Sequence, residues 1–136
     1  MSETKVEGRC LCGGVRFRVE SAPLWVGHCH CHSCRRNTGS AVATFVGFSP
    51  DQVSYTAGER QFYESSPGVR RGFCGKCGTP LSYEADRFPG EIHLYLSTLD
   101  EPERFTPQFH VFYAERIPWF EVADDLPRHR RTSRDP

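Results

Sequence analysis

Short runs in which apolar and polar side chains alternate dominate the middle of the chain. Val15, Phe17 and Val19 alternate with charged residues, which is the period-two pattern of a half-buried β-strand. Similar short apolar runs predict further strands, and the two runs on either side of Ala57-Gly58 predict a hairpin. These further strands are expected over residues 41–48, 53–56, 61–64, 69–73, 81–84, 92–97 and 111–113.

Turn-forming Gly and Pro pairs separate these runs, and ten prolines are spread through the chain. Prolines interrupt helices, so only one short helix is expected, over residues 35–38. The fold class predicted is mostly β, built from small antiparallel sheets. We expect one domain over residues 6–123. The polar ends, 1–5 and 124–136, lack a periodic apolar pattern and are expected to be flexible.

The size and charge of the chain limit the classes of partner that we expect it to bind. The 136 residues and 15.5 kDa suit one domain, and 17 basic residues balance 17 acidic ones. A nucleic-acid partner is not expected, because polyanion-binding domains carry a basic excess. Residues 41–48 form the longest apolar run, far short of the roughly 20 residues of a membrane span. Residues 1–8 lack a signal-peptide core, so we expect no membrane partner and a cytoplasmic protein. The sequence leaves open whether the chain forms a homo-oligomer.

Cysteine is the most informative residue type. The chain has seven, grouped in three clusters. In a reducing compartment such clusters indicate metal or redox chemistry more than disulfides. Tetrahedral zinc with Zn–S bonds near 2.3 Å holds its sulfurs about 3.8 Å apart, and both C-x-C and C-x-x-C pairs can reach that separation. The clusters are Cys10/Cys12, Cys29/Cys31/Cys34 and Cys74/Cys77.

The cysteine count divides into two metal sites. Cys10, Cys12, Cys74 and Cys77 make a closed four-thiolate site, which predicts a structural zinc. Cys29, Cys31 and Cys34 supply only three thiolates, and a zinc with an open fourth position is typical of a catalytic site. We therefore expect two zinc ions per chain, one structural and one catalytic.

Other interpretations of the cysteines stay open. Buried core thiols, disulfides and a redox Cys74/Cys77 pair are less favoured, because the clusters are tight and the βαβ context of redox motifs is missing. A single metal with the central cluster left as free thiols is the main competitor. One of the neighbouring histidines, His28, His30 or His32, could also close the second site. On a strand His30 would point away from its neighbouring cysteines, which favours a supporting role.

The chemistry of the open site follows from its charge. Three thiolates outweigh the zinc charge, so such a metal is a weak activator of water and suits another sulfur ligand. A thiol substrate, or an adduct of a thiol, is therefore expected. Arg35 and Arg36, together with Thr38, follow the cluster and are candidate substrate contacts. An ordinary surface position is an equal alternative for the two arginines.

Three segments carry a family resemblance. The motifs read GRCLCGGVRF over 8–17, CHCHSCRRNTGS over 29–40 and FCGKCGTPL over 73–81, followed by His110-Val111-Phe112 and Ile117-Pro118-Trp119-Phe120. Over about residues 7–122 the chain resembles the glutathione-dependent formaldehyde-activating enzymes, a family that includes centromere protein V. The resemblance implies a tent-like β fold around zinc, with structural and catalytic zinc ions on the two cysteine sets derived above.

The resemblance also implies an activity. It is the joining of glutathione to formaldehyde as S-hydroxymethylglutathione, a carbon–sulfur lyase reaction. Our first hypothesis is a zinc enzyme acting on such a thiol–aldehyde adduct, with a small-molecule thiol and an aldehyde as partners. His30 is the candidate catalytic group for the proton. The alternative is a zinc-stabilised binding or scaffold module without catalysis.

Overall fold

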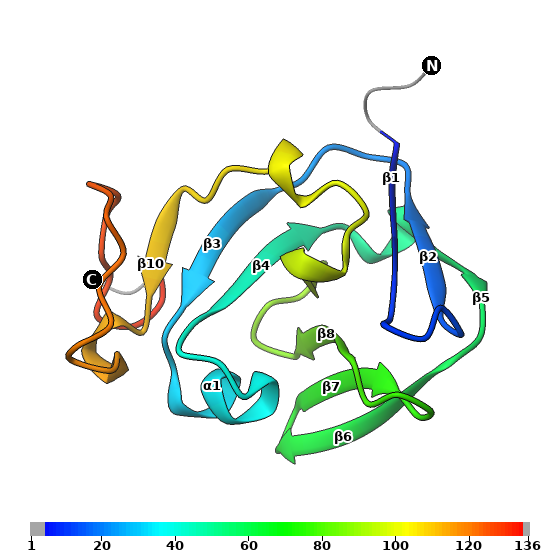
Figure 1. Cartoon of the computed structure of the whole chain (residues 1–136), viewed down its shortest axis with the longest axis horizontal. Coiled ribbons are helices and arrows are strands. Elements are labelled where there is room, and N and C mark those ends of the chain that lie inside the picture. Colours follow the sequence, from blue (N-terminus) through cyan, green and yellow to red (C-terminus); the bar gives the residue numbers. More distant parts are fainter. Residues whose placement is uncertain (1–4, 135–136) are drawn as a thin grey trace.

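The structure, a computed structural model, describes residues 5–134, and the expectations for residues 1–4 and 135–136 lie outside them. The chain forms two β-sheets and one short helix (Figure 1). The smaller sheet contains β1 (Val6–Arg9), β2 (Arg16–Val19) and β5 (Val53–Ala57), in the order β1-β2-β5, with both pairs antiparallel.

The larger sheet has seven strands in the order β10-β3-β4-β9-β8-β7-β6. Its pairs are antiparallel except for β10 with β3, which run parallel. Its strands are β3 (Trp25–Cys29), β4 (Ala43–Phe48), β6 (Arg60–Ser66), β7 (Val69–Cys74), β8 (Pro80–Ala85), β9 (Ile92–Tyr95) and β10 (Phe109–Val111).

Helices occupy little of the chain, as the prolines predict. The only α-helix of the described residues is α1 (His32–Thr38), which follows β3 and ends at Gly39 in the left-handed conformation. Single 3₁₀ turns, η1 (Pro50–Gln52), η2 (Leu96–Thr98), η3 (Pro102–Arg104) and η4 (Tyr113–Glu115), complete the elements. The prediction of a mostly β fold is confirmed.

The core lies between the two sheets. Phe17, Phe48, Leu81 and Leu94 are almost fully buried, and the alternation that predicted β2 places Phe17 and its neighbour Val19 inward. Burying such a side chain contributes roughly 1.5–3 kcal/mol. A second group of buried residues, which includes Phe45 and Tyr95, packs around two of the central cysteines. The core therefore reaches one of the predicted metal sites directly.

The predicted hairpin at Ala57-Gly58 is wrong. β5 pairs with β2 and β6 pairs with β7, so the two strands belong to different sheets. Gly58 has a φ of 70°, and a Cβ on it would collide with the carbonyl oxygen of Gly14. The chain therefore turns from one sheet to the other at a glycine that packs against a neighbouring loop.

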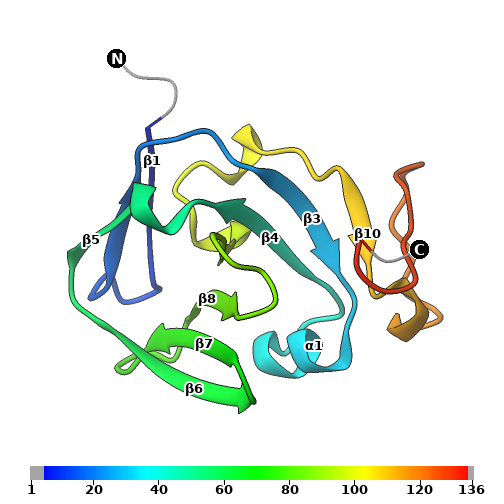
Figure 2. The same ribbon diagram turned by 180° about the vertical axis from the view of Figure 1, so that it is seen from behind.

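Residues 124–134, which the sequence predicts to be a flexible end, have defined contacts in the structure. This segment lies alongside β10 in both views (Figures 1 and 2). The N–H of His129 donates to the carbonyl of His110 at 2.8 Å, and the N–H of Phe112 donates to the carbonyl of Arg131 at 2.8 Å. The segment makes few regular strand pairs, so its polar sequence gives no periodic signal.

No helix in the described part of the chain combines the length and hydropathy that crossing a membrane requires.

Candidate metal centres and the adjoining cavity

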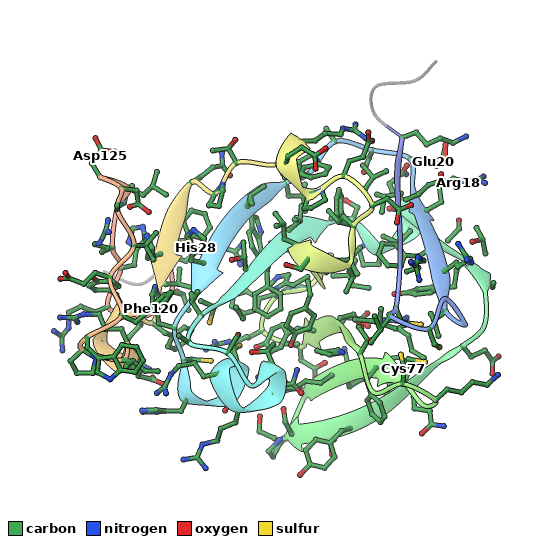
Figure 3. The ribbon with its side chains drawn as sticks, viewed as in Figure 1. Arg18, Glu20, His28, Cys77, Phe120 and Asp125 are labelled. Atoms are coloured by element: carbon green, nitrogen blue, oxygen red, sulfur yellow. The ribbon has the colours of Figure 1, made fainter. Side chains whose placement is uncertain are left out.

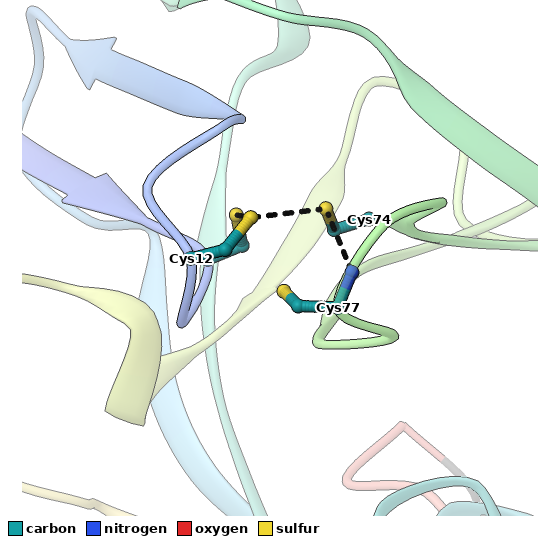
Figure 4. Close-up of side chains that lie close together, drawn as sticks. Cys12, Cys74 and Cys77 are labelled. Atoms are coloured by element: carbon teal, nitrogen blue, oxygen red, sulfur yellow. Dashed lines mark hydrogen bonds between the residues drawn. The ribbon is translucent and has the colours of Figure 1, made fainter.

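Two tight loops bring the first four thiols together. Cys10 and Cys12 lie in the loop after β1, whereas Cys74 is the last residue of β7 and Cys77 lies in the loop after it (Figure 4). The Sγ of Cys12 is 3.6 Å from that of Cys10 and 3.8 Å from that of Cys74. All four sulfurs lie within 4.8 Å of one another, as a tetrahedral four-thiolate zinc site requires.

Thr79 links the same two loops, a contact that sequence spacing did not indicate. Its Oγ1 accepts a hydrogen bond from the N–H of Leu11 at 3.0 Å. The same oxygen lies 3.1 Å from the Sγ of Cys77. Thr79 thus supports the four-cysteine site from beside it, in the way that hydrogen-bond partners commonly orient metal ligands.

The other three thiols gather where β3 meets α1. Cys29 ends β3, Cys31 caps the N-terminus of α1 and Cys34 lies in its first turn. The Sγ of Cys31 accepts from the N–H of Cys34 at 3.2 Å, and the Sγ atoms of Cys29 and Cys34 are 3.6 Å apart. Their sulfurs also lie within 4.8 Å of one another. Three thiols in such a cluster fit a metal with a fourth position left for another ligand.

The ionisation of these thiols supports a cation among them. Hydrogen bonds from Cys29 and then Cys34 lower the pKa of Cys31 to about 2. Hydrogen bonding with Cys31 and then Cys34, together with burial, raises the pKa of Cys29 well above its usual value. One thiolate thus suppresses the ionisation of its neighbour, so three thiolates together require a positive charge.

Arg71 on β7 supplies part of that charge. Its side chain is buried, its Nη1 lies 3.7 Å from the Sγ of Cys34 and 3.4 Å from the hydroxyl of Tyr95, and its Nε donates to Ser65. Sequence analysis did not select Arg71, because β7 reaches the cysteines only through sheet pairing. The signal in the sequence that could have pointed to Arg71 is an arginine within a strand that is half-buried.

A cavity of about 500 Å³ adjoins the three-cysteine cluster. Cys29, Cys31, Cys34 and Arg71 belong to its lining. Six aromatic rings form part of the remaining wall, and its polar part, which is larger, includes Glu91, His93 and the segment 132–134. A cavity of this size holds a small organic molecule.

The histidines do not join the three thiols. His28, labelled in Figure 3, accepts from or donates to the hydroxyl of Thr44 at 2.8 Å, and the ring of His32 lies 3.0 Å from Glu115. His30 is fully buried, and its Nε2 is 2.8 Å from the Nδ1 of His110. Burial, followed by the neighbouring His110, lowers the pKa of His30 to about 4.

A chain of hydrogen bonds continues from His30 to the C-terminal segment. The Nε2 of His110 lies 3.0 Å from the Oδ2 of Asp124, and the Oδ1 of the same carboxylate accepts from Arg128 at 2.8 Å. If His110 donates to Asp124, its Nδ1 accepts from His30, and the three side chains form one continuous series. A catalytic role for His30 stays a prediction, and its enclosed position favours holding the cysteine loop in place.

The three candidate substrate contacts lie outside the cavity lining. Arg35 donates to the carbonyls of His30 and Glu115 at 3.2 and 3.1 Å, which ties the loop to η4. Arg36 is exposed, and the hydroxyl of Thr38 donates to the carbonyl of Cys34 at 2.8 Å. Their role in substrate binding stays a prediction without support from the cavity geometry.

Fold and site together define a β protein with two thiolate-rich candidate metal centres, one of which opens on a ligand-sized cavity. The family model of the glutathione-dependent formaldehyde-activating enzyme matches residues 5–115, and the chain belongs to this family.

Two comparisons agree with this. A Halomonas elongata protein named "Putative glutathione-dependent formaldehyde-activating enzyme" is 30% identical over 127 residues, covering 86% of this chain and 80% of that protein. A crystal structure of a Rhodobacter sphaeroides protein matches with a TM-score of 0.59 at 24% identity, over 69% of this chain and 87% of that one, and supports the fold.

Proposed function

We propose that the protein is a zinc-dependent enzyme of the carbon–sulfur lyase class that acts on a thiol–aldehyde adduct such as S-hydroxymethylglutathione. The observation that carries the proposal is the group of three thiols, Cys29, Cys31 and Cys34, with no fourth protein ligand among the described residues, beside a ligand-sized cavity. The family similarity and the name of the Halomonas protein support the same chemistry.

The two cysteine sets fit two zinc ions, one structural and one catalytic. A zinc ion held by Cys29, Cys31 and Cys34 would offer its fourth position to a substrate thiolate. The four-cysteine set, which does not border this cavity, would hold the loops after β1 and β7 together. This division gives each set a different function.

The bond changes in the reaction are simple. The substrate sulfur attacks the carbonyl carbon, a C–S bond forms, and the carbonyl π electrons move to oxygen, which then takes a proton from solvent. Arg71 is the cation nearest the thiols, and its remaining N–H groups can donate to the oxygen as negative charge develops there. The reverse reaction breaks the same C–S bond and releases the aldehyde.

The test measures the exchange between aldehyde and hemithioacetal by NMR, since thiols also add to aldehydes without a catalyst. The zinc-loaded protein is expected to accelerate the exchange of glutathione with formaldehyde, and Cys31→Ser is expected to remove that acceleration. His32→Ala is the matched control, because His32 lies in the same loop with an exposed side chain. Exchange at the uncatalysed rate with the parent protein would contradict the proposal.

A further inference from the structure

Three possible metal ligands outside the cysteine clusters lie together at one edge of the large sheet. One ring nitrogen each of His28 and His110 and one carboxylate oxygen of Asp124 lie within 4.8 Å of one another. Two imidazoles and one carboxylate form a ligand set that zinc binds, with a fourth position left for water. Neither the two thiolate centres nor the proposed reaction uses these three side chains as ligands.

Strand pairing places the two histidines side by side. His28 on β3 is the direct partner of His110 on β10 and of Thr44 on β4. Directly paired residues project from the same face of a sheet, and the centroids of the two imidazole rings are 4.8 Å apart. Asp124 reaches the same place because the C-terminal segment lies alongside β10 (Figures 1 and 2).

This group lies on the opposite face of the sheet from the cavity beside the three cysteines. Successive side chains of a strand point to opposite faces, and the residues before and after each histidine line the cavity. These residues are Gly27, Cys29, Phe109 and Val111. A metal bound by His28 and His110 is therefore separate from the three-cysteine centre, and its binding can be tested independently of the proposed reaction.

The hydrogen bonds of the two rings leave one nitrogen of each available to a metal. The Nδ1 of His28 lies 2.8 Å from the hydroxyl of Thr44, and donation to that oxygen leaves Nε2 with a free lone pair. The Nδ1 of His110 lies 2.8 Å from the Nε2 of His30, so it can donate there while its Nε2 binds a metal. Histidine ligands commonly donate their second N–H in this way, which fixes the orientation of the ring.

The carboxylate of Asp124 is oriented towards the same nitrogen. Its Oδ2 lies 3.0 Å from the Nε2 of His110, and its Oδ1 accepts from Arg128 at 2.8 Å and from the N–H of Leu126 at 3.0 Å. The two contacts on Oδ1 hold the carboxylate in place and leave Oδ2 facing the histidine. The side chain of Asp124 is 20% exposed, so an ion from solvent can reach it.

From this arrangement we propose that His28, His110 and Asp124 form a third metal site, which binds a divalent first-row transition metal such as zinc. The ion takes the place of the proton between His110 and Asp124, and that proton moves to the Nδ1 of His110. A metal in this position joins β3 and β10 to the C-terminal segment.

The third site should bind zinc less tightly than the thiolate centres. Two neutral imidazoles and one carboxylate leave a positive charge on a divalent ion, and the neighbouring Arg128 adds to it. When His110 donates to the Nε2 of His30, the proton of His30 moves to its Nδ1. That buried nitrogen has no hydrogen-bond partner among the described residues, which makes this proton costly. We therefore expect an exchangeable ion in addition to the two held by cysteines.

The first experiment counts this ion by calorimetry. Elemental analysis of dialysed protein gives the zinc that the thiolate centres retain, and the same protein is then titrated with zinc chloride. The parent should bind one further equivalent. His28→Gln and Asp124→Asn each remove one ligand and should weaken this binding by at least about tenfold, the smallest usual effect of removing even an indirect partner of a metal. Undiminished zinc after dialysis shows that each variant is folded.

The matched controls are His32→Gln and Asp125→Asn. The side chain of His32 is 65% exposed beside Glu115, and Asp125 is the exposed neighbour of Asp124, so both variants should keep the further equivalent. Three results would overturn the proposal. They are the absence of a further equivalent in the parent, its survival in both ligand variants, and its loss in either control.

A second experiment identifies the ligands directly. In nitrogen-15 NMR of the imidazole rings, zinc added to the dialysed parent should shift the Nε2 signals of His28 and His110, because a metal replaces a proton or a lone pair there. The ring signals of His32 should stay in place. A shift confined to His32, or a shift of His28 without His110, would assign the ion to other groups and overturn the site.

Discussion

The guanidinium Nη1 of Arg71 lies 3.7 Å from the Sγ of Cys34, and Arg71 forms no ion pair with a carboxylate of the described residues. Arg71 is only 6% exposed, and a buried cation is unfavourable without a counter charge. Three thiolates around a divalent metal carry a net negative charge, which supplies it. Arg71 and the three cysteines are thus one electrostatic unit, although β7 and β3 are not neighbours in the sheet.

Replacing Arg71 should weaken metal binding at the three-cysteine site. In Arg71→Gln the thiolates lose a neighbouring positive charge, so zinc affinity there should fall by roughly 10–100-fold, the usual effect of removing a partner of a metal ligand. The zinc affinity of Arg71→Lys should lie between those of Arg71→Gln and the parent protein. Lysine keeps the positive charge, but it lacks the several N–H donors of the guanidinium group. Competition with a chromophoric chelator measures this.

The four-cysteine site in the same protein is the internal control for Arg71. Its zinc should be retained equally in the parent, Lys and Gln proteins, since the hydrogen-bond partners of Arg71 are Ser65, Cys34 and Tyr95, none of which belongs to that site. Loss of both zinc ions together would indicate a general folding defect. Unchanged affinity at the three-cysteine site would contradict the electrostatic unit.

Removing one thiol from each site should have different consequences. Cys31→Ser should lower zinc from two ions per chain to one and keep the fold, because α1 and its loop lie at one end of the sheet. Cys74→Ser should also destabilise the protein, because Cys74 is buried in the main core and joins loops distant in sequence. Elemental analysis and thermal unfolding measure the two effects. Equal loss of stability in both variants would contradict this division.

Asp124 should stabilise the buried histidines. Asp124→Ala removes the carboxylate that His110 contacts at 3.0 Å and leaves a fully buried ring nitrogen without its partner, which costs roughly 1–3 kcal/mol. Asp125→Ala is the control, since Asp125 is exposed and Figure 3 shows it at the outer end of the segment. Urea unfolding at neutral pH compares them. Equal midpoints for the two variants would show that the contact with His110 contributes nothing.

The parts of the structure that sequence could predict are the local ones. The cysteine pairs lie two or three residues apart, so their spacing alone indicated how the seven thiols divide. The strands were predictable for the same reason, because alternation is a property of neighbouring residues. The ranges 41–48 and 69–73 overlap β4 and β7 closely.

The parts that sequence missed depend on contacts between distant segments. Arg71 reaches Cys34 across 37 positions, and the partner of His30 is His110, 80 positions away. The pairing of β5 with β2 depends on Tyr55 facing Phe17, which no local pattern reveals. The cavity has the same origin, since its rings come from several strands. Motifs therefore located the metal ligands, and topology determines what surrounds them.

Glu91 should make the stability of the protein sensitive to acid. Hydrogen bonds from His93, and then from Arg134, lower its pKa from 4.5 to about 2 in the folded protein. When the pKa of a carboxyl is lower in the folded than in the unfolded protein, its ionisation stabilises the fold. That stabilisation is complete at pH values above the pKa of the unfolded state. This contribution, about 2 kcal/mol after allowance for solvent, declines as the pH falls from 4.5 towards 2.

The comparison that isolates Glu91 uses Glu91→Gln at matched pH. Acid also protonates the cysteine thiolates and releases zinc, but both proteins share that loss. The urea midpoint of the variant should lie below that of the parent at pH 7, and the gap should narrow at about pH 3, where the parent carboxyl begins to lose its advantage. Glu101→Gln is the control, because Glu101 is 61% exposed in its pair with Arg104. A gap that stays constant with pH would mean that Glu91 contributes through packing instead of charge.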